Sequence, residues 1–502
     1  MAEPFYITTA ISYPNGKPHI GHAYEAIAAD VIARFQRVQG RDVRLVTGTD
    51  EHGLKMVQTA RGESMDTRDY ADKMSQYFRQ MCDDLDVSYD AFVRTTEPRH
   101  AEASIAIWKA MEAAGDLYLD RYEGWYSVRD EAFYDESELV GEGDERLSPQ
   151  GTPVEWTVEE TWFFRLSKYQ DRLLQLYRDN PHFIQPDSRR NEVIRFVEGG
   201  LKDLSVSRTS FDWGVPVPGS PGHVMYVWVD ALTTYMTGVG YPERDGDYDR
   251  FWPADIHLIG KDIVRFHAVY WPAFLMSAKL PLPKQVFGHG FLLARGGEKM
   301  SKSAGNVIDP MELADRYGVD NLRYFLMREI SFGQDGSYSA EAIVTRCNAE
   351  LANSFGNLAQ RTLSMVFKSL DGIIPPPGEE AADRALLDQT NSACSDLKAE
   401  FSHLAFSQGL DAWMGAVFAC NAYVDEMAPW ALKKSDPQRM AAVLGTLVVA
   451  IRALAMAVAP VIPGSAEKLI ALIDSGRDGA AIEQPSPIFP RLELPEQSET
   501  AA

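Results

Sequence analysis

The chain has 502 residues, of which 45% are apolar and 24% are charged. At about 100 to 200 residues per domain, this length predicts two to four globular domains, which excludes a single small binding module and wholesale disorder. Lys and Arg total 49 against 72 Asp and Glu, a net charge of −23, so any contact with nucleic acid must use local basic patches.

Residues 5–11 form a short apolar run and predict a buried strand that ends in a turn. Apolar residues then recur at helical spacing over 20–38, and residues 44–47 predict a second strand. A strand, helix, strand order is typical of a parallel α/β sheet, whose ligands bind at the carboxyl ends of the strands. We therefore expect the chemistry near residues 11–22 and 47–52.

From residue 115 to 222 the sequence becomes rich in aromatic residues, turns and acidic side chains, which indicates an inserted subdomain. The α/β pattern then returns in three apolar runs suited to interior strands: residues 225–232, 256–259 and 285–293. After Tyr338 the pattern is that of amphipathic helices, with a proline-rich connection at 373–378. The insert therefore splits the predicted sheet, and a helical domain follows it.

Four cysteines stand far apart without a C-x-x-C pair, which favours a reducing compartment: Cys82, Cys347, Cys394 and Cys420. The N-terminus lacks the basic and apolar regions of a signal peptide, so we expect a cytoplasmic protein. The most apolar run, 441–462, contains Arg452 and Pro460. It is predicted to be a buried helix rather than a membrane span.

Two histidines stand where the first strand passes into the first helix, in His19-Ile20-Gly21-His22. Their spacing puts both imidazoles on one face of a helix N-terminus, which attracts anions. Gly21 leaves room for a nucleotide against the backbone, and both histidines can donate hydrogen bonds to phosphate oxygens. Taken alone, the motif is also explained by two surface histidines at a helix start.

A second candidate, Lys299-Met300-Ser301-Lys302-Ser303, follows the last of the apolar runs. Such a loop can close over a triphosphate, and its two lysines can neutralise the charge that develops on leaving pyrophosphate. Taken alone, it is equally a basic surface turn. Because the two motifs lie at the two ends of a split sheet, together they are far more specific than either is alone.

Together the two motifs resemble the signatures of class I aminoacyl-tRNA synthetases, and the whole chain resembles methionyl-tRNA synthetases. Further segments carry the closer resemblance: residues 13–18, 49–53, 226–232, 257–263 and 425–430. It implies an α/β fold in which a Rossmann-like parallel sheet is split by an insert and followed by an all-α anticodon-binding domain. The expected boundaries are 1–115 and 225–337 for the halves of the catalytic domain, 116–224 for the insert and 338–502 for the helical domain.

The resemblance implies a methionine–tRNA ligase that works in two steps. Methionine and ATP form methionyl-adenylate and pyrophosphate, and the 3′-terminal adenosine of initiator or elongator methionine tRNA then accepts the methionyl group. The positions implied for ATP binding and catalysis are His19, Gly21, His22, Gly260, Asp262, Lys299 and Lys302. In-line positioning and charge stabilisation suffice for this chemistry, and Mg²⁺ is expected with the ATP.

The methionine pocket of the family maps onto these positions: Ala10, Ile11, Tyr13, Asp50, Trp228, Ala231, Leu232, Tyr235, Ile263 and His267. Aromatic walls suit a polarisable thioether, and Tyr13 and His267 can offer hydrogen bonds to its sulfur. Asp50 corresponds to the carboxylate that faces the substrate ammonium group. Without the resemblance, any one of these aromatic residues is better explained as ordinary core.

The family's zinc-bearing members carry cysteine pairs in the insert, where this chain has Ser127 and Asp130 in the first pair of positions. No cysteine occurs between Cys82 and Cys347, and His182 and His223 are far apart in the sequence. A tetrahedral zinc site needs thiolate or imidazole ligands in close sets. We therefore predict no structural zinc.

The anticodon-reading positions implied by the resemblance are Asn357, Arg361 and Trp430. An indole can stack on a splayed base, and Asn or Arg can hydrogen-bond to base edges. Without the resemblance, Asn357 could pack between helices and Trp430 could lie in the core. The family's optional C-terminal dimerisation domain has no counterpart here, so we expect a monomer. Because the most apolar run contains Arg452, we expect no membrane binding.

Other enzymes and one non-enzymatic function remain as alternatives. Leucyl, isoleucyl and valyl synthetases carry an editing domain, for which an insert of about 110 residues is too small. A cysteinyl enzyme is expected to bind its substrate through zinc. A non-catalytic tRNA-binding paralogue predicts decayed signature motifs, whereas both motifs are intact here.

Overall fold

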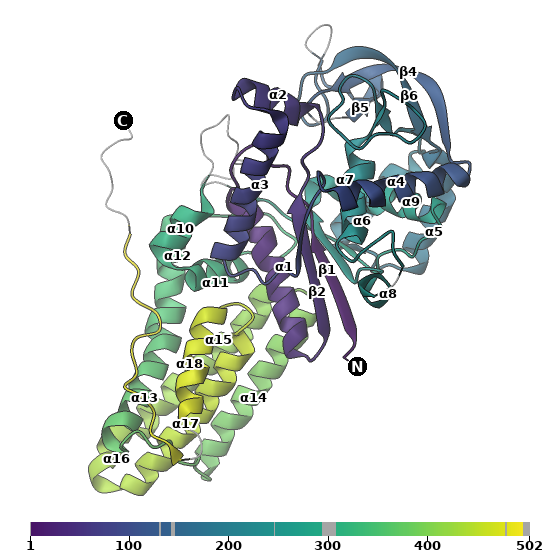
Figure 1. Cartoon of the computed structure of the whole chain (residues 1–502). Coiled ribbons are helices and arrows are strands. Elements are labelled where there is room, and N and C mark those ends of the chain that lie inside the picture. The colour runs from purple at the N-terminus through teal and green to yellow at the C-terminus, as the bar shows by residue number, and fades with distance from the viewer. Residues whose placement is uncertain are drawn as a thin grey trace. The chain divides into compact units, whose positions relative to one another are not determined.

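The computed structural model describes residues 2–129, 132–141, 146–244, 246–293, 308–476 and 479–494. The chain forms two compact units, Met1–His289 and Gly290–Ala502. The first unit is built on a parallel sheet and the second is almost wholly helical, which confirms the predicted α/β fold with a helical C-terminal region (Figure 1). The boundaries of the four predicted segments remain predictions.

A six-stranded sheet forms the centre of the first unit, in the order β3-β2-β1-β11-β12-β7. Each neighbouring pair is parallel, and β1 at the centre aligns Ile7 with Leu45 of β2 and Ile256 of β11. The strands are β1 (Pro4–Thr9), β2 (Asp42–Thr49), β3 (Ala91–Arg94), β7 (Ile184–Gln185), β11 (Ile256–Gly260) and β12 (Val286–His289). Their carboxyl ends therefore meet at one edge, where a parallel sheet binds its ligands.

Helices cover both faces of this sheet. Figure 1 shows α1 and α3 on one side of β1 and β2, and α4, α7 and α9 on the other. The helices of this unit are α1 (Ile20–Val38), α2 (Leu54–Gly62), α3 (Thr67–Asp84), α4 (Pro98–Ala113), α5 (Gln170–Asp179), α6 (Asp187–Glu198), α7 (Val227–Thr237), α8 (Asp247–Phe251) and α9 (Trp271–Ser277). A 3₁₀ turn η4 (Lys261–Ile263) and a π-helix η5 (Phe266–Tyr270) separate β11 from α9.

The insert carries its own antiparallel sheet, in the order β5-β4-β6-β8. Its strands are β4 (Leu117–Ser127), β5 (Ala132–Tyr134), β6 (Glu155–Phe164) and β8 (Leu204–Ser205), and β9 (Ser207–Arg208) pairs separately with β10 (Val224–Met225). The short strand β7 then returns to the main sheet and pairs in parallel with β12. The insert therefore supplies the edge strand of the main sheet, which the sequence did not reveal.

One predicted strand is wrong. Residues 225–232 were expected to form an interior strand, but the chain ends β10 at Met225 and begins helix α7 at Val227. Nearly every residue of α7 is buried, and the stretch 225–232 contains only one charged residue, Asp230, so it is too short to show the polar stripe that normally identifies a helix. A short apolar run without such a stripe fits a buried strand or a buried helix equally well.

The second unit consists of helices packed around α17. These are α10 (Pro310–Tyr317), α11 (Val319–Glu329), α12 (Ala340–Cys347), the π-helix η7 (Asn348–Gly356), α13 (Asn357–Ser369), α14 (Ala381–Ser402), α15 (Phe406–Met427), α16 (Pro429–Ser435), α17 (Pro437–Val458) and α18 (Pro463–Ser475). The short strands β13 (Leu292–Leu293) and β14 (Gly336–Ser337) pair at its start.

By length and composition, α17 is the one helix among the described residues that could cross a membrane, with a mean hydropathy of 2.2. It packs against α13, α14, α15, α16 and α18, and 61% of its apolar window is buried inside the unit. Arg452 on this helix pairs with Asp474 of α18 at 2.7 Å. These contacts favour a core helix, as the sequence predicted.

Candidate active site

The two histidines of the first motif cap helix α1. The His19 Nδ1 accepts a hydrogen bond from the Gly21 N–H at 3.1 Å, and the His22 Nδ1 accepts one from the His19 N–H at 3.1 Å. The two rings lie 3.8 Å apart. Because each Nδ1 is an acceptor, each neutral ring carries its proton on Nε2. The cap therefore presents two Nε2–H donors at a helix N-terminus, where anions bind well.

Gly21 is required by the first histidine as much as by any ligand. A Cβ at Gly21 would lie 2.9 Å from the His19 ring, closer than real Cβ atoms come to their neighbours. From the sequence, Gly21 was expected to leave room for a nucleotide against the backbone. The structure adds that it makes room for the capping imidazole.

Glu25 on α1 connects this helix to the carboxyl end of strand β12. Its carboxylate lies 2.8 Å from Nε2 of His289, the last residue of β12. Burial raises the pKa of Glu25, an effect that the hydrogen bond with His289 offsets in part and the charge of Asp262 reinforces. The predicted ATP-binding residue Asp262 is thus close to α1, beside Gly260 at the end of β11. The sequence analysis missed both Glu25 and His289.

A buried aromatic group joins four of the predicted methionine-pocket residues. The His267 Nδ1–H donates to the carbonyl oxygen of Ile263 at 2.9 Å, so its Nε2 accepts from the Tyr235 hydroxyl at 2.6 Å. Burial lowers the pKa of His267 to about 4, which keeps the ring neutral. Trp228 stacks on Phe266 at 3.9 Å and meets the His267 ring edge to face at 5.8 Å.

This arrangement corrects one expectation. His267 was expected to offer a hydrogen bond to the substrate sulfur, but both of its ring nitrogens are directed at protein groups. In this state the ring offers the pocket a neutral, polarisable wall. Burial raises the pKa of Tyr235, and the charges of Glu25 and Asp50 add to this effect, so both carboxylates lie near the aromatic group.

The remaining predicted pocket residues lie around the carboxyl ends of β1 and β2. The Ala10 N–H donates to the Leu258 carbonyl at 2.9 Å, and the Asp50 N–H donates to the Ser12 carbonyl at 2.9 Å. Ala231 and Leu232 are buried on α7, and Ile11 is partly buried. The Tyr13 hydroxyl accepts from the Met56 N–H at 2.9 Å, so this side chain packs toward α2 and α3 in this structure.

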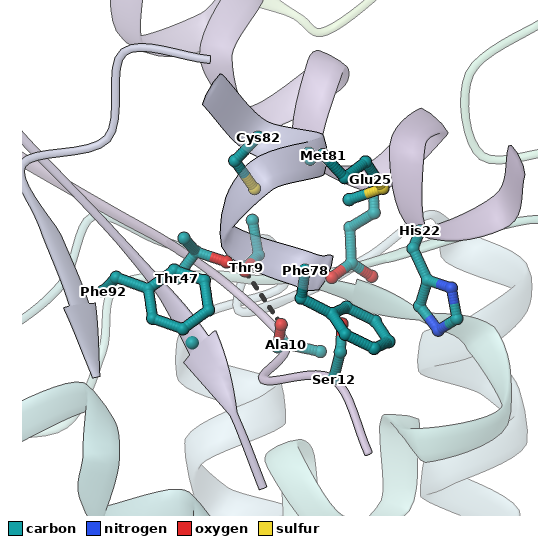
Figure 2. A pocket seen from close by; sticks show the side chains of 12 residues that line it. Thr9, Ala10, Ser12, His22, Glu25, Thr47, Phe78, Met81, Cys82 and Phe92 are labelled. Atoms are coloured by element: carbon teal, nitrogen blue, oxygen red, sulfur yellow. Dashed lines mark hydrogen bonds between the residues drawn. The ribbon is translucent and has the colours of Figure 1, made fainter. Parts of the chain in front are cut away.

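A pocket opens between α1, α3 and the ends of β1 and β2 (Figure 2). Figure 2 shows His22, Glu25 and Phe78 converging above Ala10 and Ser12. Its other lining residues are Thr9, Ala26, Thr47, Gly48, Met81, Cys82 and Phe92. Burial, with the charges of nearby aspartates, raises the pKa of the Cys82 thiol to about 12, so this cysteine is not a thiolate nucleophile.

The second motif, Lys299 to Ser303, lies outside the described residues. Its lysines therefore stay predictions from the sequence. Strand β13 precedes the motif and β14 follows it, and the two strands pair with each other in the second unit.

Ser127, one of the positions where the family's zinc-bearing members have cysteines, lies in a small group of hydroxyl side chains. Ser127 and Ser148 are buried, and each side-chain oxygen lies within 2.8 Å of Thr152 Oγ1. Asp130 lies outside the described residues. Within the residues that the structure describes, no group of three or more His, Cys, Asp or Glu side chains is placed to hold a metal ion. The absence of zinc stays a prediction.

The predicted anticodon residues gather on the surface of the second unit. The Arg361 guanidinium lies 5.7 Å from the centre of the Trp430 ring, and its Nη2 lies 3.5 Å from Asp425 Oδ1. Trp430 is 50% exposed, and Asn357 is exposed one helical turn before Arg361. The alternative in which Trp430 and Asn357 are core residues therefore does not fit this unit.

Comparisons with known proteins identify the family of this chain. The family model "tRNA synthetases class I (M)" matches residues 5–363, and the model "Anticodon binding domain of methionyl tRNA ligase" matches residues 374–486. The chain is 56% identical to the methionine–tRNA ligase of Brucella suis and 53% identical to that of Mycobacterium bovis, in each case over 99% of both chains.

A crystal structure of the Mycobacterium tuberculosis methionyl-tRNA synthetase bound by methionyl-adenylate is similar with a TM-score of 0.93. The two chains are 52% identical, and the matched region covers 97% of this chain and 100% of the Mycobacterium tuberculosis chain. The resemblance predicted from the sequence motifs is therefore confirmed over nearly the whole length. The chain belongs to the methionyl-tRNA synthetase family of class I tRNA synthetases.

Proposed function

We propose that this family member activates L-methionine with ATP and transfers it to methionine tRNA. In the first step a carboxylate oxygen of methionine bonds to the α-phosphorus, and the bond to pyrophosphate breaks. In the second step a ribose hydroxyl of the terminal adenosine attacks the methionyl carbonyl, and AMP leaves. Neither step needs a protein nucleophile, which agrees with a site built from imidazoles, carboxylates and lysines.

The proposal rests mainly on the neutral aromatic group of Trp228, Tyr235 and His267, which lies near two carboxylates. Tyr235 and His267 are buried, Trp228 is partly buried, and none of the three rings is charged, which suits an uncharged and polarisable side chain. Asp50 and Glu25 are close enough to add to the raised pKa of Tyr235. A substrate that joins an apolar side chain to an ammonium group fits this combination, with Asp50 as the ammonium partner.

ATP is proposed to lie across the N-terminus of α1. The Nε2–H groups of His19 and His22 donate to its phosphate oxygens, and Gly260 and Asp262 bind the nucleoside end from the tip of β11. Lys299 and Lys302 neutralise the charge on departing pyrophosphate. Mg²⁺ accompanies ATP as part of the substrate, since nucleotide-bound Mg²⁺ is held mainly by phosphates and waters.

The tRNA anticodon is proposed to bind at Asn357, Arg361 and Trp430. A half-exposed indole beside a guanidinium offers a stacking surface for an unpaired base, and the Asn357 amide can read a base edge. We also propose that the chain acts as a monomer in the cytoplasm. The buried position of α17 in its helical unit supports only the expectation that this helix does not span a membrane.

Exchange of labelled pyrophosphate into ATP, measured with each of the twenty amino acids, tests the proposed substrate. Methionine alone should drive rapid exchange. Stronger exchange with leucine, isoleucine or cysteine would rule out the proposed pocket, and no exchange with any amino acid would favour the non-catalytic paralogue.

The role of Asp50 is tested in the same assay. Asp50→Asn should raise the KM for methionine about 10- to 150-fold, the value of a hydrogen bond to a charged group. Asp42→Asn is the matched control, because Asp42 lies at the amino end of the same strand and pairs with Arg250. A rise in KM of equal size in both variants would contradict the assignment.

A further inference from the structure

A buried carboxylate joins three elements behind the proposed methionine pocket. Asp230 on α7 is 1% exposed and lies 2.6 Å from His52 Nδ1 and 2.7 Å from His100 Nε2. His52 comes from the turn after β2, and His100 from α4. Burial alone would raise the pKa of Asp230, but the two histidines outweigh it and lower the pKa, so the carboxylate is ionised. We call these three residues the Asp230 clamp.

The hydrogen bonds of His100 show that the clamp is anchored from its rear. His100 donates from Nε2 to Asp230, because a carboxylate can only accept. On its other side, His100 Nδ1 lies 2.9 Å from the Thr237 hydroxyl, which is itself 3.2 Å from the Thr233 carbonyl. Both anchoring threonines belong to α7 itself. His100 is therefore locked to this helix at both ring nitrogens.

Helix α7 carries the proposed pocket and the clamp on opposite faces. The pocket side carries Trp228, Ala231, Leu232 and Tyr235. The clamp side carries Asp230, Thr233 and Thr237. At 3.6 residues per turn these two sets lie about 180° apart around the axis. The clamp therefore does not line the pocket but sets the place of the helix that does.

The other end of the clamp reaches the turn that carries Asp50. Glu51 in this turn is held toward β3 by Arg94, at 2.7 Å, and its carbonyl accepts from Trp213 Nε1 at 2.6 Å. Neither contact involves α7. The contact between His52 and Asp230 joins the turn that carries Asp50 to helix α7.

We infer that Asp230 is a positioning residue that sets the distance between the ammonium partner Asp50 and the side-chain pocket on α7. The inference rests on the proposed function, because it takes Asp50 as the ammonium partner. Asp230 acts only through His52, which follows Asp50 by two residues. A displacement of about 1 Å within a binding site can cost on the order of 100-fold in rate.

Asp230→Asn tests the inference. An amide keeps the shape of the carboxylate but turns one acceptor into a donor that faces an imidazole N–H. The KM for methionine in pyrophosphate exchange should rise by about 10- to 100-fold, while the KM for ATP changes little. Asp116→Asn is the matched control, because Asp116 is an equally buried carboxylate with three side-chain partners outside this site, Lys168, Tyr169 and Ser277. It should lower the melting temperature without a selective effect on methionine.

A pair of inhibitors separates positioning from general damage. L-Methioninol keeps the ammonium group, and the corresponding alcohol lacks only its amino group. The ratio of their inhibition constants therefore measures the ammonium contact. Asp230→Asn should reduce this ratio, as Asp50→Asn does, whereas a merely loosened fold would weaken both inhibitors equally. An unchanged ratio in Asp230→Asn, beside a reduced ratio in Asp50→Asn, would overturn the inference alone.

The same inhibitor ratio also covers two further outcomes, an unchanged ratio in Asp50→Asn and an Asp230→Asn variant that does not fold. If Asp50→Asn leaves the inhibitor ratio unchanged, Asp50 is not the ammonium partner, and the proposed function loses that assignment together with the inference. If Asp230→Asn does not fold, His52→Ala removes the same link at the more exposed end of the clamp, since His52 is 8% exposed. The ratio must fall in this variant too, and an unchanged ratio overturns the inference.

Discussion

The proposed methionine pocket and the proposed anticodon surface present their side chains to water in opposite ways. His267 is fully buried, with both ring nitrogens bonded to protein groups. Trp430 is 50% exposed, and its neighbour Arg361 makes only a long contact with Asp425. A small substrate must leave water to be recognised, whereas a nucleic-acid base must be met by a side chain that already faces the solvent.

This difference decides what a substitution can reveal. A buried polar group without its partner costs about 1 to 3 kcal/mol, so substitutions in the pocket change stability and activity together. Surface substitutions usually change stability by less than about 0.5 kcal/mol. Matched controls are therefore needed in the first unit, whereas the second unit can show selective loss of one activity.

The largest effect is expected for a substitution of Lys302. This residue lies outside the described residues and belongs neither to the methionine pocket nor to the anticodon surface. Lys302→Ala should lower the adenylation rate by about 100- to 1,000-fold, because its charge stabilises the transition state more than bound ATP. Single-turnover adenylate formation and ATP affinity check it. Lys284→Ala is the control, since Lys284 is a surface lysine paired with Asp255. A defect wholly explained by weaker ATP binding would assign Lys302 a different role.

Acid should destabilise the first unit through His267. Its pKa in the folded chain is about 4 against 6.5 ordinarily, so between these pH values the unfolded chain binds the proton and the folded chain does not. This contribution to stability is complete above pH 6.5 and is lost as the pH falls toward 4, by up to about 3 kcal/mol.

Urea unfolding at several pH values, for the wild type and His267→Gln, measures this contribution. Glutamine can still accept the Tyr235 hydrogen bond but does not titrate, so the variant should lose less stability on acidification. Parallel pH profiles for the two proteins would show that His267 is not buried in its neutral form.

The smallest expected effect concerns the insert. Elemental analysis should find well under one zinc per chain, and a chelator should leave the melting temperature unchanged, because Ser127 stands at a cysteine position of the zinc-bearing members and contacts the hydroxyl of Thr152. Zinc at one atom per chain would show that the ligands were misidentified, with His182 and His223 the first candidates.

The sequence predicted the parts of this molecule that repeat a simple pattern. Strands β1 and β2 and helix α1 follow the apolar periodicity, and the ends of these strands hold Ala10 and Asp50 where ligands were expected. The wrong prediction, residues 225–232, falls on a helix buried on all sides. The edge strand β7 was missed because two residues carry no periodicity.

The connections within the site could not be predicted because they join distant segments. The clamp links His52 to Asp230 across 178 residues, and Glu25 meets His289 across 264. Two π-helices lie at proposed site residues. Helix η5 contains His267, and helix η7 ends just before Asn357. Such segments interrupt the 3.6-residue period on which sequence patterns depend.

One measurement tests the separation of the two sites most directly: methionine-dependent pyrophosphate exchange, tRNA charging and the melting temperature, all on one preparation of Trp430→Ala. We expect a roughly 5- to 150-fold loss of charging efficiency from about 1 to 3 kcal/mol of lost base stacking. Exchange and melting temperature should be nearly unchanged, because Trp430 is half-exposed. Equal loss of both activities with a lower melting temperature, the behaviour of a core tryptophan, would contradict it.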